Sequence, residues 1–300
     1  MAEGMIGFVG LGVMGEPICR NIAARSGRRV VAFDVRPEPL ARLVAAGVRA
    51  ASRLAEVAAA DTILLSLPGG AEVEAVVLGE AGLIRHLRPG HTVVDLSTCP
   101  VALARRIGER LAERGVAFAD APVARTRQAA IEGTLSIMVG ADATTFERIR
   151  PLLGAAASEI THCGAVGAGQ VVKLMNNMVL FQTVVALAEA LAIGRAAGVD
   201  GRVLFETLTK GSADSFALRN HGLKALLPGD FPESAFATDY AIKDVSYALE
   251  LAGETGVPAE GAALARRILE RSSAAGNGAA YFPALIRVIA RSFERGDRVG

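Results

Sequence analysis

Few cysteines and no excess of charge of either sign characterise this sequence of 300 residues. The three cysteines, Cys19, Cys99 and Cys163, are widely spaced, so they provide neither a disulfide framework nor the ligand spacing of a zinc site. We therefore expect no bound metal and a reducing, cytoplasmic compartment. The 32 basic and 31 acidic residues leave a net charge of +1, which argues against a nucleic-acid-binding protein.

The sequence also lacks the pattern of a signal peptide or a membrane span. Residues 5–10 already have the pattern of a strand, and no basic segment precedes them. The most apolar segment, residues 171–193, is interrupted by five polar residues, namely Lys173, Asn176, Asn177, Gln182 and Glu189. A membrane span has about 20 residues with few such interruptions. We interpret the segment as a buried helix of a soluble protein and expect no membrane partner.

The first half of the chain alternates short apolar runs with amphipathic segments. This alternation predicts an α/β domain, a doubly wound parallel sheet with helices on both faces. Helices are expected at residues 14–26 and 143–153 and between the other strands. The predicted strands are residues 5–10, 28–34, 62–68, 91–97, 115–122 and 133–140.

After about Gly164 the strand pattern ends, and the rest of the sequence has helical character. We therefore predict a dinucleotide-binding domain of residues 1–165 and an all-α domain of residues 166–300. The joining helix, about residues 169–197, is hydrophobic around its circumference, so we expect it to be enclosed by its own domain, a second subunit or both. We expect a homodimer or homotetramer, and a purely structural role in assembly is an alternative reading of this helix.

A glycine-rich turn follows the first predicted strand and opens the first helix. Its G-x-G-x-x-G spacing brings backbone N–H groups and a helix N-terminus to a pyrophosphate, whereas a tight turn without a ligand is the alternative. Asp34 ends the second strand, where an acid accepts hydrogen bonds from ribose hydroxyls and repels a 2′-phosphate. We therefore favour NAD over NADP, although Arg36 is placed to meet a phosphate. The turn residues are Gly10, Leu11, Gly12, Val13, Met14 and Gly15.

Two later segments fit the same cofactor, because they follow predicted strands at the edge where ligands of such sheets bind. They are Leu67-Pro68 and Ser97-Thr98. The alternative is ordinary turn chemistry, in which Ser97 and Thr98 cap the helix that begins near Pro100, and both readings can hold together.

A polar strip interrupts the apolar joining helix. Lys173 and Asn177 are four residues apart and share a helix face, with Asn176 beside them and Gln170 one turn earlier. An apolar setting lowers the pKa of a lysine towards the range of a general acid or base, and asparagines orient a substrate without adding charge. A lysine that snorkels to the surface is the alternative.

Five ordered motifs, GFVGLGVMGEPICRNI, DLST, DAPV, GTLSIMVGA and GAGQVVKLMNN, resemble the β-hydroxyacid dehydrogenases, and YAIKDVSYALELA resembles the C-terminal segment of that family. The resemblance implies that Lys173 is the catalytic acid/base with Asn177 as its partner. It implies that Thr98 and Lys243 contact the nicotinamide half of the cofactor, and that Ser97 and Asn176 contact the substrate. From sequence alone, Lys243 and Asp244 would be read as an exposed helix position.

One segment departs from the common family pattern. After DAPV the common members carry Ser-Gly-Gly against the substrate carboxylate, whereas this chain carries Ala124, Arg125 and Thr126. This form resembles the sulfolactaldehyde reductase branch, in which an arginine holds the sulfonate. Guanidinium is a rigid fork for an oxyanion, and a surface arginine in a loop is the alternative.

We therefore expect an NAD-dependent oxidoreductase that interconverts a small anionic hydroxy compound and its aldehyde or ketone. Sulfolactaldehyde reduction leads, and the alternative substrate is 3-hydroxyisobutyrate or another 3-hydroxy-carboxylate or semialdehyde. Outside the enzymes, the same fold serves a non-catalytic dinucleotide sensor.

Overall fold

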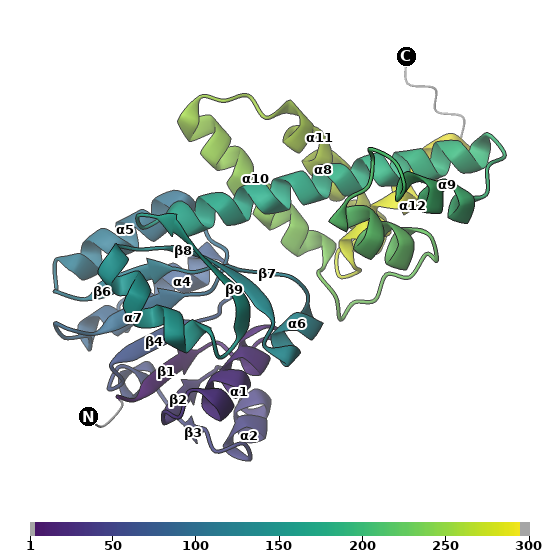
Figure 1. Cartoon of the computed structure of the whole chain (residues 1–300). Coiled ribbons are helices and arrows are strands. Elements are labelled where there is room, and N and C mark those ends of the chain that lie inside the picture. The colour runs from purple at the N-terminus through teal and green to yellow at the C-terminus, as the bar shows by residue number, and fades with distance from the viewer. Residues whose placement is uncertain (1–3, 295–300) are drawn as a thin grey trace. The chain divides into compact units, whose positions relative to one another are not determined.

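The computed structural model describes the backbone of residues 4–294 and the side chains of residues 4–290. Contacts between Cα atoms divide the chain into two units, Met1–Lys173 and Leu174–Gly300. The fold is the predicted one, an α/β unit with a mostly parallel sheet followed by a helical unit (Figure 1).

Nine strands of the first unit form one sheet in the order β3-β2-β1-β4-β5-β6-β8-β7, with β9 paired to β8. All six predicted strands are present. Each has a buried or nearly buried pattern, as expected where helices cover both faces of a sheet. The strands are β1 (Ile6–Val9), β2 (Val30–Phe33), β3 (Arg49–Ala50), β4 (Thr62–Leu65), β5 (Thr92–Asp95), β6 (Ala117–Asp120), β7 (Val123–Ala124), β8 (Leu135–Gly140) and β9 (Ala157–Gly164).

Three of these strands, β3, β7 and β9, are absent from the prediction. β3 and β7 have two residues each, too few for a periodic pattern. In β9, polar residues such as Glu159 and Thr161 are exposed, so the strand has little of the apolar pattern that marks its neighbours. The sheet is also not fully parallel, because β8 runs antiparallel to both β6 and β7.

Helices of the first unit cover both faces of the sheet. Side chains of α1 and α7 pack with Phe8 and Leu64 on one face, and side chains of α4 and α5 pack with Val9 and Leu65 on the other. Successive strand residues therefore belong to different cores, as the two-residue period of a strand requires. The helices are α1 (Gly15–Arg25), α2 (Pro37–Val44), α3 (Leu54–Val57), α4 (Gly70–Leu78), the 3₁₀ helix η1 (Leu83–Arg85), α5 (Val101–Ala112), α6 (Arg127–Glu132) and α7 (Ala143–Leu153).

The second unit is built from helices around a core that includes Phe181, Phe205 and Phe282. The long helix α8 (Ala168–Ala196) starts in the first unit and continues into the second. The other helices are α9 (Gly201–Leu208), η2 (Leu218–Leu226), α10 (Thr238–Thr255), α11 (Glu260–Ser272), η3 (Ser273–Asn277), η4 (Phe282–Leu285) and α12 (Ile286–Glu294); η2 and η3 are π-helical and η4 is 3₁₀.

α8 is more exposed within the chain than its apolar circumference suggested. Val172, Val179 and Ile193 are 41%, 57% and 69% exposed. Within residues 4–294, α8 is the one helix long and apolar enough to cross a membrane. The buried helix of a soluble protein meets the same criteria of length and composition, so these do not place α8 in a membrane.

The end of β8 lies close against the start of α8. A Cβ atom on Gly140 would lie 2.4 Å from Asp120 Oδ1 and 2.8 Å from the backbone nitrogen of Gly169. The equivalent atom on Gly253, within α10, would meet nothing within 4 Å. The two glycines therefore form a matched pair, one packed and one open.

Gly140→Ala should lower the free energy of unfolding by about 1–3 kcal/mol, because the methyl group forces the first turn of α8 away from β6. Gly253→Ala, the control, should be neutral or stabilise by up to about 1 kcal/mol, since alanine favours a helix interior. Urea unfolding of both variants measures the difference. Equal midpoints would show that the start of α8 is not tightly packed.

Candidate functional site

The glycine-rich turn lies between β1 and α1, as predicted. Gly10 has a φ of +90°, and a Cβ atom there would lie 2.3 Å from the carbonyl oxygen of Ser66. A Cβ on Gly15 would lie 2.0 Å from the carbonyl oxygen of Gly10. A Cβ on Gly12, by contrast, would meet nothing within 4 Å. The fold of the turn therefore requires two of the glycines, whereas the third leaves open space in front of the turn.

The N-terminus of α1 suits a pyrophosphate. Its N-cap residue, Met14, makes no side-chain hydrogen bond to the helix. The first N–H groups of a helix have no intrahelical partners and attract anions. The open side at Gly12 and this helix end together fit a dinucleotide.

Asp34, at the end of β2, is bound to the same turn. Its Oδ2 accepts a hydrogen bond of 2.5 Å from the backbone N–H of Leu11, and its Oδ1 accepts one of 2.8 Å from the backbone N–H of Arg36. The Arg36 side chain is 59% exposed, and its Nε lies 3.6 Å from Asp34 Oδ1. Asp34 thus shapes the turn from the second strand, and Arg36 offers a positive charge beside it.

The ends of β4 and β5 are joined through Ser97. Its Oγ accepts a hydrogen bond of 2.9 Å from the backbone N–H of Leu67, beside Pro68, and its own backbone N–H donates to Asp95 Oδ1 at 2.9 Å. The helix that follows, α5, has Pro100 at its N-cap and no side-chain cap. Ser97 therefore links two loops, and the alternative in which it caps α5 is wrong.

Two buried carboxyl groups lie at the ends of β5 and β6. Burial raises the pKa of Asp95 to about 6, against the lowering effect of its hydrogen bonds with Ser97. Burial likewise raises the pKa of Asp120 to about 6. Neither was assigned a role from the sequence, because no local pattern shows that the last residue of each strand is buried.

Asp120 holds the first turn of α8. Its Oδ1 accepts a hydrogen bond of 2.6 Å from the backbone N–H of Gly167, and its Oδ2 accepts one of 2.7 Å from that of Gln170. A carboxylate at a helix N-terminus satisfies unpaired N–H groups and interacts favourably with the helix dipole. This contact fixes the position of the first turn of α8, and therefore the position of Lys173 on that helix.

Lys173 is half-buried and is the last residue of the first unit. Its predicted partners follow on the same helix, where Asn177 is 3% exposed and Asn176 is exposed. Asn176 Nδ2 donates to Asn177 Oδ1 at 3.1 Å. The spacing on one continuous α8 is as predicted, and the catalytic roles of these residues stay predictions.

Asp244 is a partner that the sequence did not reveal. It is 2% exposed, and its Oδ2 accepts a hydrogen bond of 2.7 Å from Asn177 Nδ2. Lys243 Nζ lies 3.0 Å from Asp244 Oδ1 and over the rings of Tyr240 and Tyr247. The reading of this pair as an exposed helix position is therefore wrong, because Asp244 is buried and Lys243 is half-buried.

Arg125 has a φ of +84°, the one positive value at a non-glycine residue among those described. Its Nη1 donates to the carbonyl oxygen of Thr134 at 2.5 Å and to Ser158 Oγ at 2.8 Å. Ala124 belongs to β7, and Thr126 caps α6 by accepting from the N–H of Ala129. All three residues have local structural partners, and their contact with a substrate stays a prediction.

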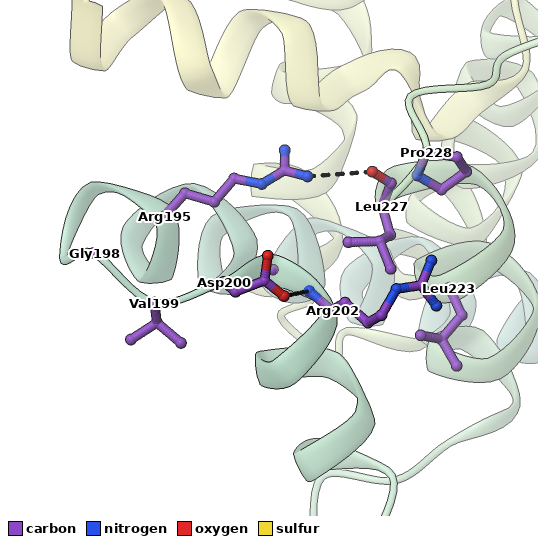
Figure 2. A pocket seen from close by; sticks show the side chains of 9 residues that line it. Arg195, Gly198, Val199, Asp200, Arg202, Leu223, Leu227 and Pro228 are labelled. Carbon is purple, nitrogen blue, oxygen red and sulfur yellow. Dashed lines mark hydrogen bonds between the residues drawn. The ribbon is translucent and has the colours of Figure 1, made fainter.

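A hollow in the second unit lies elsewhere. About 580 Å³ in volume, it is lined by residues that include Arg195, Asp200 and Leu227 (Figure 2). Arg195 Nη2 donates to the carbonyl oxygen of Leu227 at 3.2 Å, and Asp200 Oδ1 accepts from the backbone N–H of Arg202 at 2.9 Å. None of the predicted site residues lines this hollow.

Known proteins resemble the chain over almost its whole length. Residues 5–164 match the NAD binding domain of 6-phosphogluconate dehydrogenase, and residues 167–289 match the NAD-binding domain of NADP-dependent 3-hydroxyisobutyrate dehydrogenase. The 2-(hydroxymethyl)glutarate dehydrogenase of Eubacterium barkeri is 38% identical over 284 residues, which cover 94% of each chain. The NAD-dependent L-serine dehydrogenase of Pseudomonas aeruginosa is 38% identical over 237 residues, covering 79% of this chain and 78% of that protein.

A solved structure supports the same assignment. The 3-hydroxyisobutyrate dehydrogenase of Mycobacterium tuberculosis, solved with L-serine, superposes with a TM-score of 0.87 at 32% identity, covering 95% of this chain and 99% of that one. The open glycine turn and the helical second unit agree with this likeness. The chain belongs to the β-hydroxyacid dehydrogenase family and is an NAD(P)-dependent dehydrogenase that acts on the CH–OH group of small hydroxy acids.

Proposed function

We propose that this dehydrogenase oxidises a small 3-hydroxy-carboxylate to its semialdehyde, with NAD as the hydride acceptor. The names of three relatives support this substrate class, because 2-(hydroxymethyl)glutarate, L-serine and 3-hydroxyisobutyrate share one chemical core. Each has a primary alcohol on the carbon next to the one that bears the carboxylate. They differ in the group on that middle carbon, and the proposal leaves this group open.

The position of Arg125 is the observation that carries the choice of a carboxylate over a sulfonate. Its guanidinium is bound to Thr134 and Ser158, so its side chain supports the turn that joins β7 to α6. With a φ of +84°, the backbone adopts a form that glycine prefers. Residue 125, where the common members of the family carry glycine, therefore keeps a backbone form that glycine prefers.

A sulfonate such as that of sulfolactaldehyde is the second candidate. Both hydrogen bonds of Arg125 use Nη1, and the guanidinium has further N–H groups that suit an oxyanion. The residue is also exposed. A bidentate contact through both Nη groups, however, would require Arg125 to release Thr134 and Ser158, which makes this the weaker candidate.

In the proposed reaction, Lys173 takes the proton of the substrate hydroxyl. A bound NAD would accept the hydride that leaves the carbon bearing this hydroxyl group. Lys173 must be neutral to act as a base. In the reverse direction the same Nζ returns the proton to the carbonyl oxygen.

Asn177 would orient the hydroxyl group and the lysine. Its Nδ2 is committed to Asp244 and its Oδ1 to Asn176, so the amide cannot rotate freely. Asp244 is in turn paired with Lys243. We infer that this chain of contacts holds the Asn177 amide in one orientation during turnover.

Gly12→Ala should weaken NADH binding at least tenfold, a loss of about 1.4 kcal/mol, because its methyl group occupies the space proposed for the pyrophosphate. The unfolding temperature should stay that of the parent, since the added atom meets no protein atom within 4 Å. Gly15→Ala is the contrast and should destabilise the fold. Unchanged NADH affinity of Gly12→Ala, measured by fluorescence titration, would show that the pyrophosphate does not occupy the space at Gly12.

The parent should use NAD at least about tenfold more efficiently than NADP, because the Asp34 carboxylate would face a 2′-phosphate of like charge. Asp34→Asn keeps an acceptor for the Leu11 N–H and removes the charge, so it should reduce the preference for NAD over NADP. The kcat/KM values for both cofactors test this. Equal use of NADP by the parent, lost in Arg36→Ala, would assign cofactor choice to Arg36.

With NAD, the parent should oxidise 3-hydroxyisobutyrate, L-serine or 2-(hydroxymethyl)glutarate at least about tenfold more efficiently than 2,3-dihydroxypropane-1-sulfonate. Lys173→Ala should lose about 10² to 10⁴ in kcat because the proton acceptor is missing, while NADH binding persists. Lys210→Ala, an exposed lysine of the second unit, is the control.

Two results would contradict this proposal. A higher kcat/KM for the sulfonate than for every carboxylate would make Arg125 the substrate ligand. Parent-like turnover by Lys173→Ala would remove Lys173 from the mechanism.

A further inference from the structure

Gln170 is a fully buried amide in the first turn of α8, with 0% exposure. Its Nε2 donates to the carbonyl oxygen of Ser97 at 2.8 Å, and its Oε1 accepts from the backbone N–H of Cys99 at 3.2 Å. One bond needs a donor and the other an acceptor, so the amide has a single satisfactory orientation. Gln170 therefore spans both ends of the segment Ser97–Cys99.

That segment is itself held from two other strand ends. Ser97 Oγ binds the N–H of Leu67 after β4, and the Ser97 N–H binds Asp95 at the end of β5. Cys99 Sγ also donates to Asp95 Oδ2 at 3.7 Å. Thr98, the residue predicted to contact nicotinamide, lies in the middle of this fixed segment.

The backbone of Gln170 is anchored as firmly as its side chain. Its N–H donates to Asp120 Oδ2 at 2.7 Å. Lys173 follows three residues later on the same helix, about 4.5 Å further along the axis and on a neighbouring part of the surface. A change at Gln170 is thus transmitted to Lys173 through one rigid helical turn.

We propose that Gln170 is a positioning residue for hydride and proton transfer, because it fixes Lys173 relative to the Ser97–Cys99 segment. The proposal rests on the proposed function, in which Lys173 moves the proton and Thr98 adjoins the nicotinamide. The two transfers occur at one carbinol group, so the acceptors must keep a set separation. An error of about 1 Å in such a geometry can cost about a hundredfold in rate.

Gln170→Met keeps the length of the side chain and removes both hydrogen bonds. We expect kcat to fall about tenfold to a hundredfold, with the substrate KM and the NADH dissociation constant changed less than about threefold. With substrate deuterated at the carbinol carbon, the isotope effect on kcat should increase, since hydride transfer becomes slower than product release. Gln182→Met, on the same helix, is the control because, among the residues that the structure describes, its amide donates only to the carbonyl oxygen of Met178 within α8.

Gln170→Glu gives a second test, in which one variant is compared with itself at different pH values, so that a loss of stability cannot be mistaken for a loss of positioning. A protonated carboxyl group donates to Ser97 and accepts from Cys99, as the amide does, whereas a carboxylate has no donor for Ser97. Burial raises the pKa of such a group, and the facing Asp95 and Asp120 raise it further, against the attraction of Lys173. The kcat of this variant relative to the parent should therefore rise as the pH is lowered from about 9 to about 6.

Failure of the inference differs from failure of the proposed function. Parent-like kcat and isotope effect in Gln170→Met, with only a lower unfolding temperature, would reduce Gln170 to a packing residue. A pH-independent ratio for Gln170→Glu would do the same. Parent-like turnover by Lys173→Ala would overturn both the mechanism and this role for Gln170.

Discussion

The contact between the Asp120 carboxylate and the first turn of α8 is the constraint on which the site depends. A strand end supplies the charge, and the N–H groups of Gly167 and Gln170 supply the donors. Gly140 and Gly169 lack side chains at the point of closest approach. This contact, together with the side-chain hydrogen bonds of Gln170, sets the position of the first turn of α8 and hence that of Lys173.

A buried carboxylate is an expensive anchor, and its cost is visible in the pKa of Asp120, which burial raises to about 6. The backbone N–H groups of α8 act in the opposite direction and keep the charged form accessible. Asp95 lies in a similar setting, and the charge of Asp120 adds to the effect of burial in raising its pKa. Two neighbouring strand ends therefore carry buried acidic groups, of which Asp95 binds the Ser97–Cys99 segment and Asp120 binds the first turn of α8.

Much of the architecture could be predicted from the sequence, because local patterns determine it. The apolar runs gave β1, β2, β4, β5, β6 and β8, and the glycine spacing gave the turn before α1. The start of α8 was predicted within one residue. β9 was missed because its exposed polar residues do not alternate with a clear apolar face.

The supporting contacts of the site could not be predicted in the same way. The hydrogen bond from Gln170 to Ser97 joins residues 73 positions apart, and that from Asn177 to Asp244 joins residues 67 apart. Each polar residue alone resembles a solvated helix or turn residue. Only the tertiary fold shows that both ends of these pairs are buried, and burial is what makes an unpaired amide or carboxylate costly.

The left-handed backbone of Arg125 has a consequence for how this position changes over generations. Glycine adopts the same conformation without the steric cost, about 1–2 kcal/mol, that a side chain incurs there. Selection for stability alone would therefore favour glycine at residue 125. An arginine that persists against that gradient marks a retained side-chain role, whether as the brace between Thr134 and Ser158 or as a ligand. Among relatives with arginine at this turn, the presence or absence of a hydroxyl at position 158 would separate these two histories.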